Sequence, residues 1–489
     1  MLIEAVLGTQ VKFTGGYNIL LEGKPGRLIE ALPEPEALYL PLRSRRFEFS
    51  ELCVEDGRRV NGGGVLARDP NNYAVPLLAP RAGLVRLDAA KGHIVLEDIS
   101  KTEFAYSEQG ELPHIVRQMG EAGIKRHKLL ELGAWQYFSD AFGGALPDPL
   151  GRPQAVIVST ISLEPFVARG DVQLQERLLD FTRGLEHLQS LLEYQPIYLV
   201  MPDISSDFAL QVRRQIRGYA RAELIEIPLK YPYDNPNILA RHLRLKRDGG
   251  PVWFVRTEGA LAVDRALTLS KPCLSRIVSV AGSAVELPVH INVMTGYPIK
   301  DIRTRCIPAG VVRIINGGVL TGRAIDTETL GLDTECTGLT VLAEHTEREL
   351  FGFARPGWDR SCYAACFLSS LRKDFRERFT TAMRGEDRAC VSCNFCEEVC
   401  PAGIMPHLLH KYLYRDLLEE TEQARIDLCI ECGLCSFVCP SKIDLTNQFI
   451  EAKAMLEQEK EEIRREKLKA EELQRQQEAR GRSAKEKEY

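Results

Sequence analysis

The period of the apolar positions changes along the chain and divides it into segments. Residues 27–100 show short apolar runs separated by Gly, Pro and Asn, which is typical of strands and turns. Between residues 102 and 265, short runs such as 155–158 (AVIV) and 197–201 (IYLVM) alternate with helical patterns, including an amphipathic helix expected over 172–192. This βαβ order predicts a largely parallel sheet covered by helices, a fold that commonly binds a ligand at the carboxyl edge of its strands.

The second half of the chain predicts further parts. Residues 266–345 are strand-rich and indicate a small α/β module, and residues 346–385 indicate a linker with helical pieces. The tail from residue 451 to 489 carries 11 basic and 11 acidic side chains and only a thin apolar stripe. It predicts a long or partly disordered helix, which is either a docking arm for a partner or a solvated appendage.

Composition and charge narrow the class of protein. A length of 489 residues allows about three or four domains, and a formal charge of -5 leaves no basic footprint for nucleic acid. No apolar run approaches the roughly 18 residues that span a bilayer, and the first 15 residues lack the pattern of a signal peptide. We therefore expect a soluble protein, which docking through partners can still bring to a membrane.

Eight cysteines form the most specific motif of the chain. The spacing C-x2-C-x2-C-x3-C-P occurs twice, as Cys390, Cys393, Cys396 and Cys400 before Pro401, and as Cys429, Cys432, Cys435 and Cys439 before Pro440. A tight loop can present three thiolates to one cubane, while the fourth arrives from a more distant segment. In two-cluster ferredoxins of this pattern the fourth cysteine of each run ligates the other cluster. The motif therefore predicts two [4Fe-4S] clusters and a reducing compartment.

The exchange of the fourth cysteine defines the expected ligand sets. Cluster 1 takes Cys390, Cys393, Cys396 and Cys439, and cluster 2 takes Cys429, Cys432, Cys435 and Cys400. Structural zinc sites are the alternative for paired CxxC units, but zinc has no use for the doubled four-cysteine run. A disulfide scaffold would be short and rich in cysteine throughout, whereas eight of the 14 cysteines here lie within 50 residues.

Other cysteines and two histidines carry weaker signals. Cys362 and Cys366 are four positions apart and would share a helix face, either as an additional metal site or as packing. His407 and His410 follow the first run at helical spacing and either tune cluster 1 or occupy exposed helix positions. We expect the isolated cysteines to be small core residues: Cys53, Cys273, Cys306 and Cys336. No HExxH, Walker A or G-x-S-x-G motif is present, which removes the common hydrolase and NTPase classes.

Two segments before residue 100 resemble the hammerhead barrel of biotinyl and lipoyl domains. Residues 54–67 (VEDGRRVNGGGVLA) and 76–85 (PLLAPRAGLV) match its outgoing and returning strands. No lysine occurs between Lys24 and Lys91, so the barrel is expected to be a scaffold and not a swinging carrier arm. The three glycines at 62–64 indicate a hairpin turn, because no strand and helix frame them as a phosphate loop requires.

The chain as a whole resembles the Rnf/Nqr family. Residues 400–408 (CPAGIMPHL) and 428–445 (LCIECGLCSFVCPSKIDL) are similar to the cluster domain of the C subunit of the Rnf electron-transport complex. The body is more similar to the A subunit of the Na+-translocating NADH:quinone reductase. The segments that carry this second resemblance are 128–135 (KLLELGAW), 155–166 (AVIVSTISLEPF), 316–322 (NGGVLTG) and 349–357 (ELFGFARPG). Together the resemblance covers nearly everything from residue 27 to 450.

The resemblance implies a multidomain architecture of α/β and β parts. The first half is expected to hold a hammerhead barrel-sandwich hybrid at 1–101 and an α/β domain related to the flavin-binding subunit of Complex I at 102–265. An SLBB β-grasp-like module at 266–345 and the linker at 346–385 follow. The chain then continues with a ferredoxin-like helical domain that holds two [4Fe-4S] clusters at 386–448, and with a charged C-terminal helix at 449–489.

The flavin site of the Rnf type is degenerate in this chain. Its G-x-G-G-A-x-F-P loop corresponds to residues 141–147 (AFGGALP), which keep Gly143, Gly144 and Ala145 but lack the first glycine and the Phe-Pro ending. Of the Rnf-like E-C-E-P motif, Glu164 and the proline after it remain. Close backbone approach to a phosphate depends on the absence of Cβ atoms. We therefore expect a degenerate nucleotide or quinone site that holds no FMN, with quinone as the remaining ligand.

The resemblance implies an iron–sulfur electron-transfer subunit of a membrane-associated, ion-translocating oxidoreductase of the Rnf/Nqr type. The electron donor of such a complex is NADH or ferredoxin, and the acceptor is quinone or NAD. Its partners would be membrane-embedded and flavin-carrying subunits, with NADH, quinone or ferredoxin as redox partner, at the cytoplasmic side of the bacterial inner membrane. The transported ion, Na+ or H+, is left open. Two alternatives remain: a self-sufficient NADH dehydrogenase that contains FMN, and a quinone-interacting adaptor whose clusters are structural.

Overall fold

The computed structural model describes most of the chain, in ten stretches. These are residues 9–10, 13–101, 113–203, 207–216, 222–307, 310–326, 328–345, 357–372, 374–382 and 388–486, with side chains of the last helix described as far as residue 472. The chain separates into two compact units, Met1–Gly385 and Glu386–Tyr489. Of the segment 349–357 that carries part of the family resemblance, only Gly357 lies within the described residues.

A six-stranded sheet forms the centre of the α/β part of the first unit. Its strand order is β1 (Thr9–Gln10), β13 (Ala222–Ile227), β12 (Ile197–Pro202), β11 (Ala155–Ser159), β14 (Val252–Arg256) and β10 (Phe138–Asp140). β11 pairs in parallel with both β12 and β14, and β10 at the edge runs antiparallel to β14. The parallel pairing expected for the apolar runs at 155–158 and 197–201 is therefore present.

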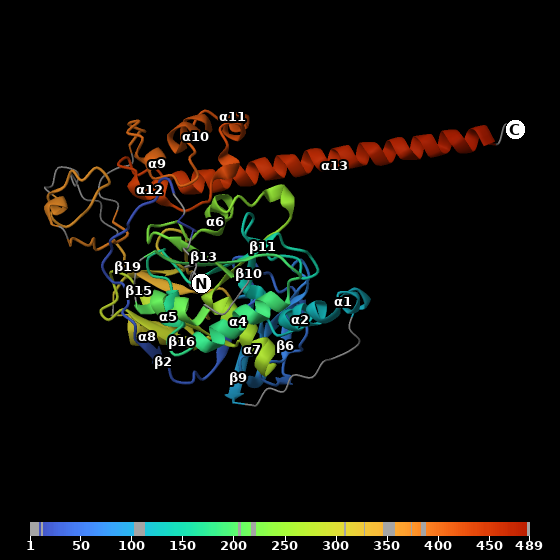
Figure 1. Cartoon of the computed structure of the whole chain (residues 1–489), viewed down its shortest axis with the longest axis horizontal. Helices are drawn as coiled ribbons and strands as arrows, with labels where there is room; N and C mark the ends of the chain where they lie inside the picture. Colours follow the sequence, from blue (N-terminus) through green and yellow to red (C-terminus); the bar gives the residue numbers. More distant parts are fainter. Residues whose placement is uncertain are drawn as a thin grey trace, which may run out of the picture. The chain divides into compact units, whose positions relative to one another are not determined.

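Apolar clusters cover both faces of this sheet. Val156 and Val158 of β11 belong to the cluster that contains residues of α4 (Leu178–Ser190) and α7 (Thr257–Leu269). The intervening Ile157 belongs to a second cluster with residues of α6 (Pro236–His242). Because successive side chains of a strand point to opposite faces, the two clusters lie on opposite sides of the sheet. Figure 1 accordingly shows α4 and α7 below the strands and α6 above them.

The helix expected over residues 172–192 is divided. A short α3 (Gly170–Gln173) ends before α4, and Glu176 between them has a left-handed φ of +59°. α4 then packs closely on α7, because a Cβ at Gly184 would lie only 2.2 Å from the carbonyl oxygen of Ala260. The remaining helices of this part are α1 (His114–Gln118), α2 (Gly120–Glu131) and α5 (Asp207–Ile216).

A second six-stranded sheet forms the following module of the first unit. Its order is β18 (Arg323–Ala324), β17 (Val312–Asn316), β19 (Gly338–Ala343), β15 (Ser275–Ala281), β16 (Val289–Met294) and β2 (Ile29–Ala31), with α8 (Ile299–Cys306) after β16. β2 comes from the N-terminal segment and pairs in parallel with β16. β1 likewise joins β13 of the first sheet. Two strands from the range expected for the barrel, 1–101, thus belong to other sheets.

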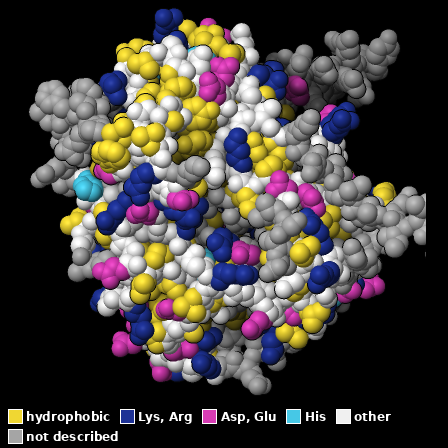
Figure 2. All heavy atoms as spheres, turned by 60° about the vertical axis from the view of Figure 1, so that its left-hand side comes forward, with side chains coloured by type: hydrophobic (Ala, Val, Ile, Leu, Met, Phe, Trp, Pro, Cys, Tyr) yellow, Lys and Arg dark blue, Asp and Glu magenta, His cyan; other side chains and the backbone are white. Residues whose placement is uncertain are grey.

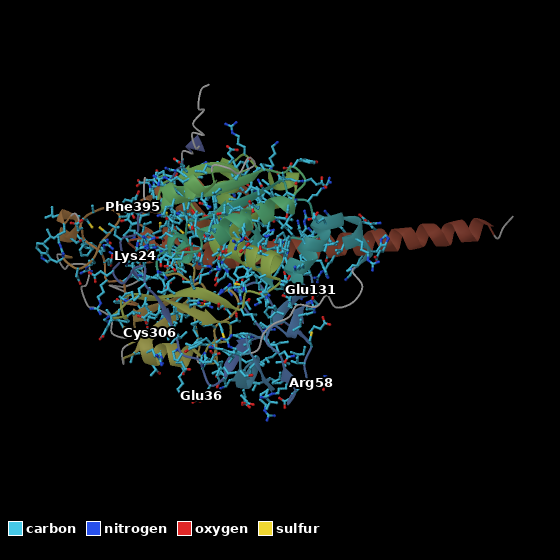
Figure 3. The ribbon with its side chains drawn as sticks, turned by 60° about the horizontal axis from the view of Figure 1, so that its bottom comes forward. Lys24, Glu36, Arg58, Glu131, Cys306 and Phe395 are labelled. Atoms are coloured by element: carbon cyan, nitrogen blue, oxygen red, sulfur yellow. The ribbon has the colours of Figure 1, made fainter. Side chains whose placement is uncertain are left out.

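The rest of that range forms two small antiparallel sheets. One has the order β3 (Leu38–Pro41), β9 (His93–Ser100), β8 (Ala82–Asp88) and β5 (Arg59–Val60), and the other has β4 (Glu51–Leu52), β6 (Val65–Asp69) and β7 (Val75–Leu78). Gly64 donates its N–H to Asn61 O at 3.0 Å, so the glycines lie in a turn. Arg68 pairs with Glu131 of α2 at 2.8 Å, and Figure 3 shows Glu131 beside these strands.

The second unit is helical. It contains α9 (Phe395–Glu398), α10 (Pro406–Leu413), α11 (Leu418–Gln423), α12 (Leu434–Val438) and the long α13 (Leu445–Glu486). The first turns of α13 lie in the core of this unit, where Phe449 is fully buried beside Leu409 of α10. Beyond residue 456 the described side chains of α13 are almost all exposed. Figure 1 shows this helix continuing well past the other helices of its unit. The expected tail at 449–489 therefore begins with core residues.

No helix among the described residues is long and apolar enough to cross a membrane. On the face that Figure 2 shows, basic and acidic side chains are interspersed.

Candidate cluster sites

The eight motif cysteines surround two separate cavities of the second unit. One cavity is lined by Cys390, Cys393, Cys396 and Cys439, and the other by Cys400, Cys429, Cys432 and Cys435. Each cavity thus takes three cysteines from one run of the motif and the fourth from the other run. We call them the first and the second cysteine cavity.

Left-handed backbone turns bring three sulfurs of each run together. Every residue of the second run lies 39 positions after its counterpart in the first. Ser392 and Asn394 have φ of +53° and +63°, and their counterparts Glu431 and Gly433 have +55° and +78°. Such conformations are unfavourable for residues other than Gly and Asn, so the same strain at matching positions indicates that the loop shape is required. α9 and α12 begin directly after these turns.

The motif cysteines are buried or partly buried. Burial raises the pKa of Cys396 and of Cys429 to about 11, and that of Cys435 to about 12. A buried thiolate needs a positive partner, and iron supplies one when it is ligated. None of the eight cysteines forms a disulfide. The donor set, four thiols that line one cavity, therefore fits a cluster in both places.

Backbone N–H groups point at several of these sulfurs. Those of residues 402–404 donate toward Cys400, and those of Glu431 and Leu434 toward Cys429 and Cys432. Each such donor favours the thiolate over the thiol and so opposes the effect of burial on the pKa. Hydrogen bonds to cluster sulfurs are also a principal determinant of cluster potential. The loops thus position the ligands and provide polar contacts to them.

A zinc ion would require a tighter arrangement. Zinc binds thiolates at about 2.3 Å in a tetrahedron, which brings its four sulfurs close together. Among the described residues, no group of three or more His, Cys, Asp or Glu side chains is arranged to hold a single metal ion. The four thiols of each cysteine cavity instead face a common space.

The surroundings of the two cavities differ in charge. Lys453 of α13 donates to the carbonyl oxygen of Cys429 at 3.2 Å and pairs with Glu431 beside the second cavity. At the first cavity, His407 lies in the lining, with its Nδ1 3.5 Å from Glu397 Oε2. His410 instead bonds through Nδ1 to Gln448 of α13 at 2.8 Å. Of the two histidines, only His407 is therefore placed to influence a cluster directly.

The glycine loop expected to mark a nucleotide site has its amides engaged within the chain. Asp140 Oδ2 accepts hydrogen bonds from the backbone N–H groups of Phe142 at 3.1 Å and Gly143 at 2.8 Å. Gly144 donates its N–H to the carbonyl oxygen of Asp140 at 2.8 Å, and Ala145 is exposed. A carboxylate of the protein thus occupies the position at which a phosphate would accept from such a loop.

Glu164 lies at a different place from this loop. Its carboxylate accepts from the N–H of Leu320 at 3.0 Å and from the N–H and hydroxyl of Thr321, both at 2.7 Å. Burial raises its pKa, against the effect of these donors. A Cβ at Gly318 would come within 2.2 Å of the Glu164 side chain, so the 316–322 loop closes on this carboxylate only because it has a glycine there. Gly143, Gly144 and Ala145 are not among the residues that line the cavity at Glu164.

Glu164 borders a large cavity of about 880 Å3 in the first unit. The N-terminal segment contributes Arg43 and His93, the α/β part contributes Arg256, and the loop after β17 contributes Arg323. Arg256 is held by the carbonyl oxygen of Ile161 at 2.9 Å and by Asp234 at 3.2 Å. The sequence analysis missed these residues because three distant segments build the cavity and no local motif marks it.

The six remaining cysteines are free. Cys336 is buried as expected, but the expectation of a core position is wrong for Cys53, which is exposed. Cys306 ends α8, where Figure 3 labels it, and burial raises its pKa. Cys362 and Cys366 lie in a turn and not on a helix face, with their sulfurs 2.8 Å apart.

Comparisons with known proteins agree with this arrangement. The chain matches family models of a 4Fe-4S dicluster domain over residues 389–444, the NqrA second alpha/beta domain over 120–268 and the NQRA C-terminal domain over 277–327. It is 25% identical over 422 residues to the A subunit of the Na(+)-translocating NADH-quinone reductase of Pseudomonas aeruginosa, covering 85% of this chain and 91% of the relative. The same subunit of Actinobacillus pleuropneumoniae is 27% identical over 367 residues, covering 73% and 78%.

These matches confirm the resemblance predicted from the sequence. The body carries NqrA domains, and the dicluster domain is consistent with the cluster domain of the Rnf C subunit. Homologues of the chain are subunits of an oxidoreductase complex. Among solved structures, an NAD+-reducing [NiFe]-hydrogenase in the H2-reduced state has a TM-score of 0.38 at 10% identity, covering 69% of this chain and 61% of that chain. A likeness of this degree supports no inference about function.

Proposed function

We propose that this protein is an iron–sulfur electron-transfer subunit of a membrane-associated, ion-translocating oxidoreductase of the Rnf/Nqr type. The observation that supports it most is the pair of four-cysteine cavities, each built from both runs of the motif, in one chain with two NqrA domains. Clusters of the [4Fe-4S] type supply one-electron transfer. The chain would thus connect a two-electron donor or acceptor to one-electron carriers of the complex.

The ligand sets are part of this proposal. Cys390, Cys393, Cys396 and Cys439 hold cluster 1, and Cys429, Cys432, Cys435 and Cys400 hold cluster 2. The loops orient the thiolates, and the core around Phe449 excludes water from the second cavity. Lys453 donates to the carbonyl oxygen of Cys429 beside the second cavity, with Glu431 as its counter-ion.

The proposal includes no flavin on the glycine loop. Asp140 competes for the amides that would otherwise bind a phosphate, so Gly143, Gly144 and Ala145 offer no anion site. The quinone expected from the sequence is assigned instead to the large cavity that Glu164 borders.

The size of that cavity favours one second candidate function. A volume of about 880 Å3 falls within the range of cofactor and ligand sites, and its lining has several arginines. A self-sufficient NADH dehydrogenase with FMN bound there would use it. Stoichiometric flavin in the purified protein, together with reduction of the clusters by NADH alone, would establish this alternative.

The expected partners and location follow from the same family. They are the membrane-embedded and flavin-carrying subunits of the complex at the cytoplasmic side of the bacterial inner membrane, with NADH, quinone or ferredoxin as redox partner. The part of α13 after residue 461 is the proposed docking arm, and its described side chains, residues 462–472, are exposed.

The test is gentle extraction of the membrane followed by isolation of the full chain with its neighbours. We expect about eight iron and eight acid-labile sulfides per chain and co-purification of Nqr-type or Rnf-type membrane subunits. Zinc as the principal metal, or a chain that purifies alone from intact membranes, would contradict the proposal. Clusters that cannot be reduced at physiological potentials would favour the structural adaptor.

A further inference from the structure

Cys362 and Cys366 form a pair of thiols in the first unit, outside the cluster domain. Their sulfurs are 2.8 Å apart, and a disulfide bond has a length of about 2.05 Å, so closure requires a movement of roughly 0.8 Å. The turn between them is set by Ala365, which has φ of +52° and donates its N–H to the carbonyl oxygen of Cys362 at 3.1 Å. The turn therefore holds the two sulfurs within a short movement of disulfide-bond length.

The two thiols have different surroundings. The backbone N–H of Cys366 donates to Cys362 Sγ at 3.1 Å, and the thiol of Cys366 lies in hydrogen-bond contact with the same sulfur. This contact raises the pKa of Cys366, and burial adds to the effect. The backbone N–H that donates to Cys362 Sγ, in a turn that holds Cys366 Sγ beside it, favours Cys362 as the attacking sulfur. Cys362 is the nucleophile of the pair and Cys366 is the resolving thiol.

The turn is anchored and accessible at the same time. Ser361 donates its N–H at 3.1 Å and its hydroxyl at 2.5 Å to Glu377 Oε2, and the N–H of Glu377 bonds to the carbonyl oxygen of Leu20 at 3.0 Å. Cys366 is exposed and Cys362 is partly exposed. No third Cys, His, Asp or Glu among the described residues completes a metal site with them. A small reagent can reach the pair without unfolding of the turn.

We propose that Cys362 and Cys366 form a redox-active dithiol that exchanges two electrons with low-molecular-weight disulfides. The Cys362 thiolate attacks one sulfur of the external disulfide, forming a mixed disulfide and releasing one thiolate. Cys366 then attacks the Cys362 sulfur, giving the internal disulfide and releasing the second thiol. Two protein thiols are oxidised and one disulfide is reduced to two thiols, and the two protons leave with the thiols. The reverse steps restore the dithiol.

The experiment uses the intact holoprotein and glutathione disulfide under anaerobic conditions, which spare the clusters. Samples are quenched in acid, alkylated and cleaved after Lys and Arg. Both cysteines then lie in one peptide, residues 361–372, which contains no other cysteine. After treatment with glutathione disulfide, we expect the mass of this peptide to fall by two hydrogens and neither cysteine to be alkylated, at any protein concentration. Reduced glutathione should restore the dithiol, so that both cysteines are alkylated again. The peptide 47–58, which contains only the exposed Cys53, reports general thiol oxidation in the same sample.

Two variants separate the roles of the thiols. Cys366→Ser should trap glutathione on Cys362, whereas Cys362→Ser should react more slowly at Cys366, with the iron content of the protein unchanged in both. Equal reaction rates in the two variants would overturn the assignment of the nucleophile. The proposal is overturned if peptide 361–372 of the wild-type protein remains a dithiol under conditions that glutathionylate Cys53. It is also overturned if the disulfides of Cys362 and Cys366 form between chains and not within one chain.

Discussion

The exchange of the fourth cysteine between the two cavities can be tested by Cys400→Ser. Cys400 lies in the first run of the motif but lines the second cavity with Cys429, Cys432 and Cys435. Removal of its thiolate should therefore destabilise cluster 2 and leave cluster 1 in place. Two complete [4Fe-4S] clusters hold about eight iron atoms, so the variant should retain about four.

The assay identifies which thiols become free. The native protein is alkylated without oxygen, then denatured and cleaved with trypsin. Residues 389–411 form one peptide with all cysteines of the first run, and residues 426–442 form another with all cysteines of the second run. In Cys400→Ser we expect three alkylated cysteines in the second peptide, Cys429, Cys432 and Cys435, and none in the first.

The matched control is Cys439→Ser. It should give the mirror result, with three alkylated cysteines in the first peptide and none in the second, because Cys439 lines the first cavity. If each variant instead frees the other three cysteines of its own run, the exchange is refuted. Loss of all eight iron atoms in both variants would show that each cluster depends on the other for its stability. The expectation that about four iron atoms remain would then be wrong.

Three further predictions concern stability and docking. Phe449→Ala should lower the free energy of unfolding of the second unit by about 3–5 kcal/mol, measured by denaturant titration, because the ring is fully buried. Leu468→Ala, at an exposed position of α13, should change this free energy by less than about 0.5 kcal/mol. A chain that ends before Glu462 keeps the ion pair of Lys460 with Glu422, so it should retain all its iron. It should dissociate from membranes at a lower salt concentration than the full chain does, and undiminished membrane binding would contradict a docking arm. Asp140→Ala leaves backbone N–H groups without their acceptor and should cost about 2 kcal/mol, with Asp140→Asn intermediate; unchanged thermal unfolding would show that these bonds contribute nothing.

Local patterns determined much of this protein. The doubled cysteine motif indicated two tight loops that each present three thiolates, and in the structure each loop turns at left-handed residues, Ser392 and Asn394 in one and Glu431 and Gly433 in the other. A strand buried on both faces must be apolar at every position, and the run at 155–158 therefore indicated a central strand of a parallel sheet. These predictions succeeded because the constraint and the residues that satisfy it lie within a few positions of each other.

Contacts between distant segments decided the rest. β1 and β2 are too short to show a period, and only their pairing with β13 and β16 assigns them to a sheet. The sequence pattern of the glycine loop indicated a weakened anion site, but the Asp140 carboxylate accepts hydrogen bonds from the backbone N–H groups of this loop. The Glu164 carboxylate binds a different loop, more than 150 positions further along the chain.

Cys362 and Cys366 had a helical spacing, yet a left-handed Ala365 places them in a turn with their sulfurs in contact. Likewise Phe449 belongs to the core of the second unit although the charged sequence after it resembles a free tail. A sequence pattern states what each residue can do locally. Which hydrogen-bond acceptor reaches a loop, and which apolar face is covered, depends on chain segments that only the tertiary fold brings together.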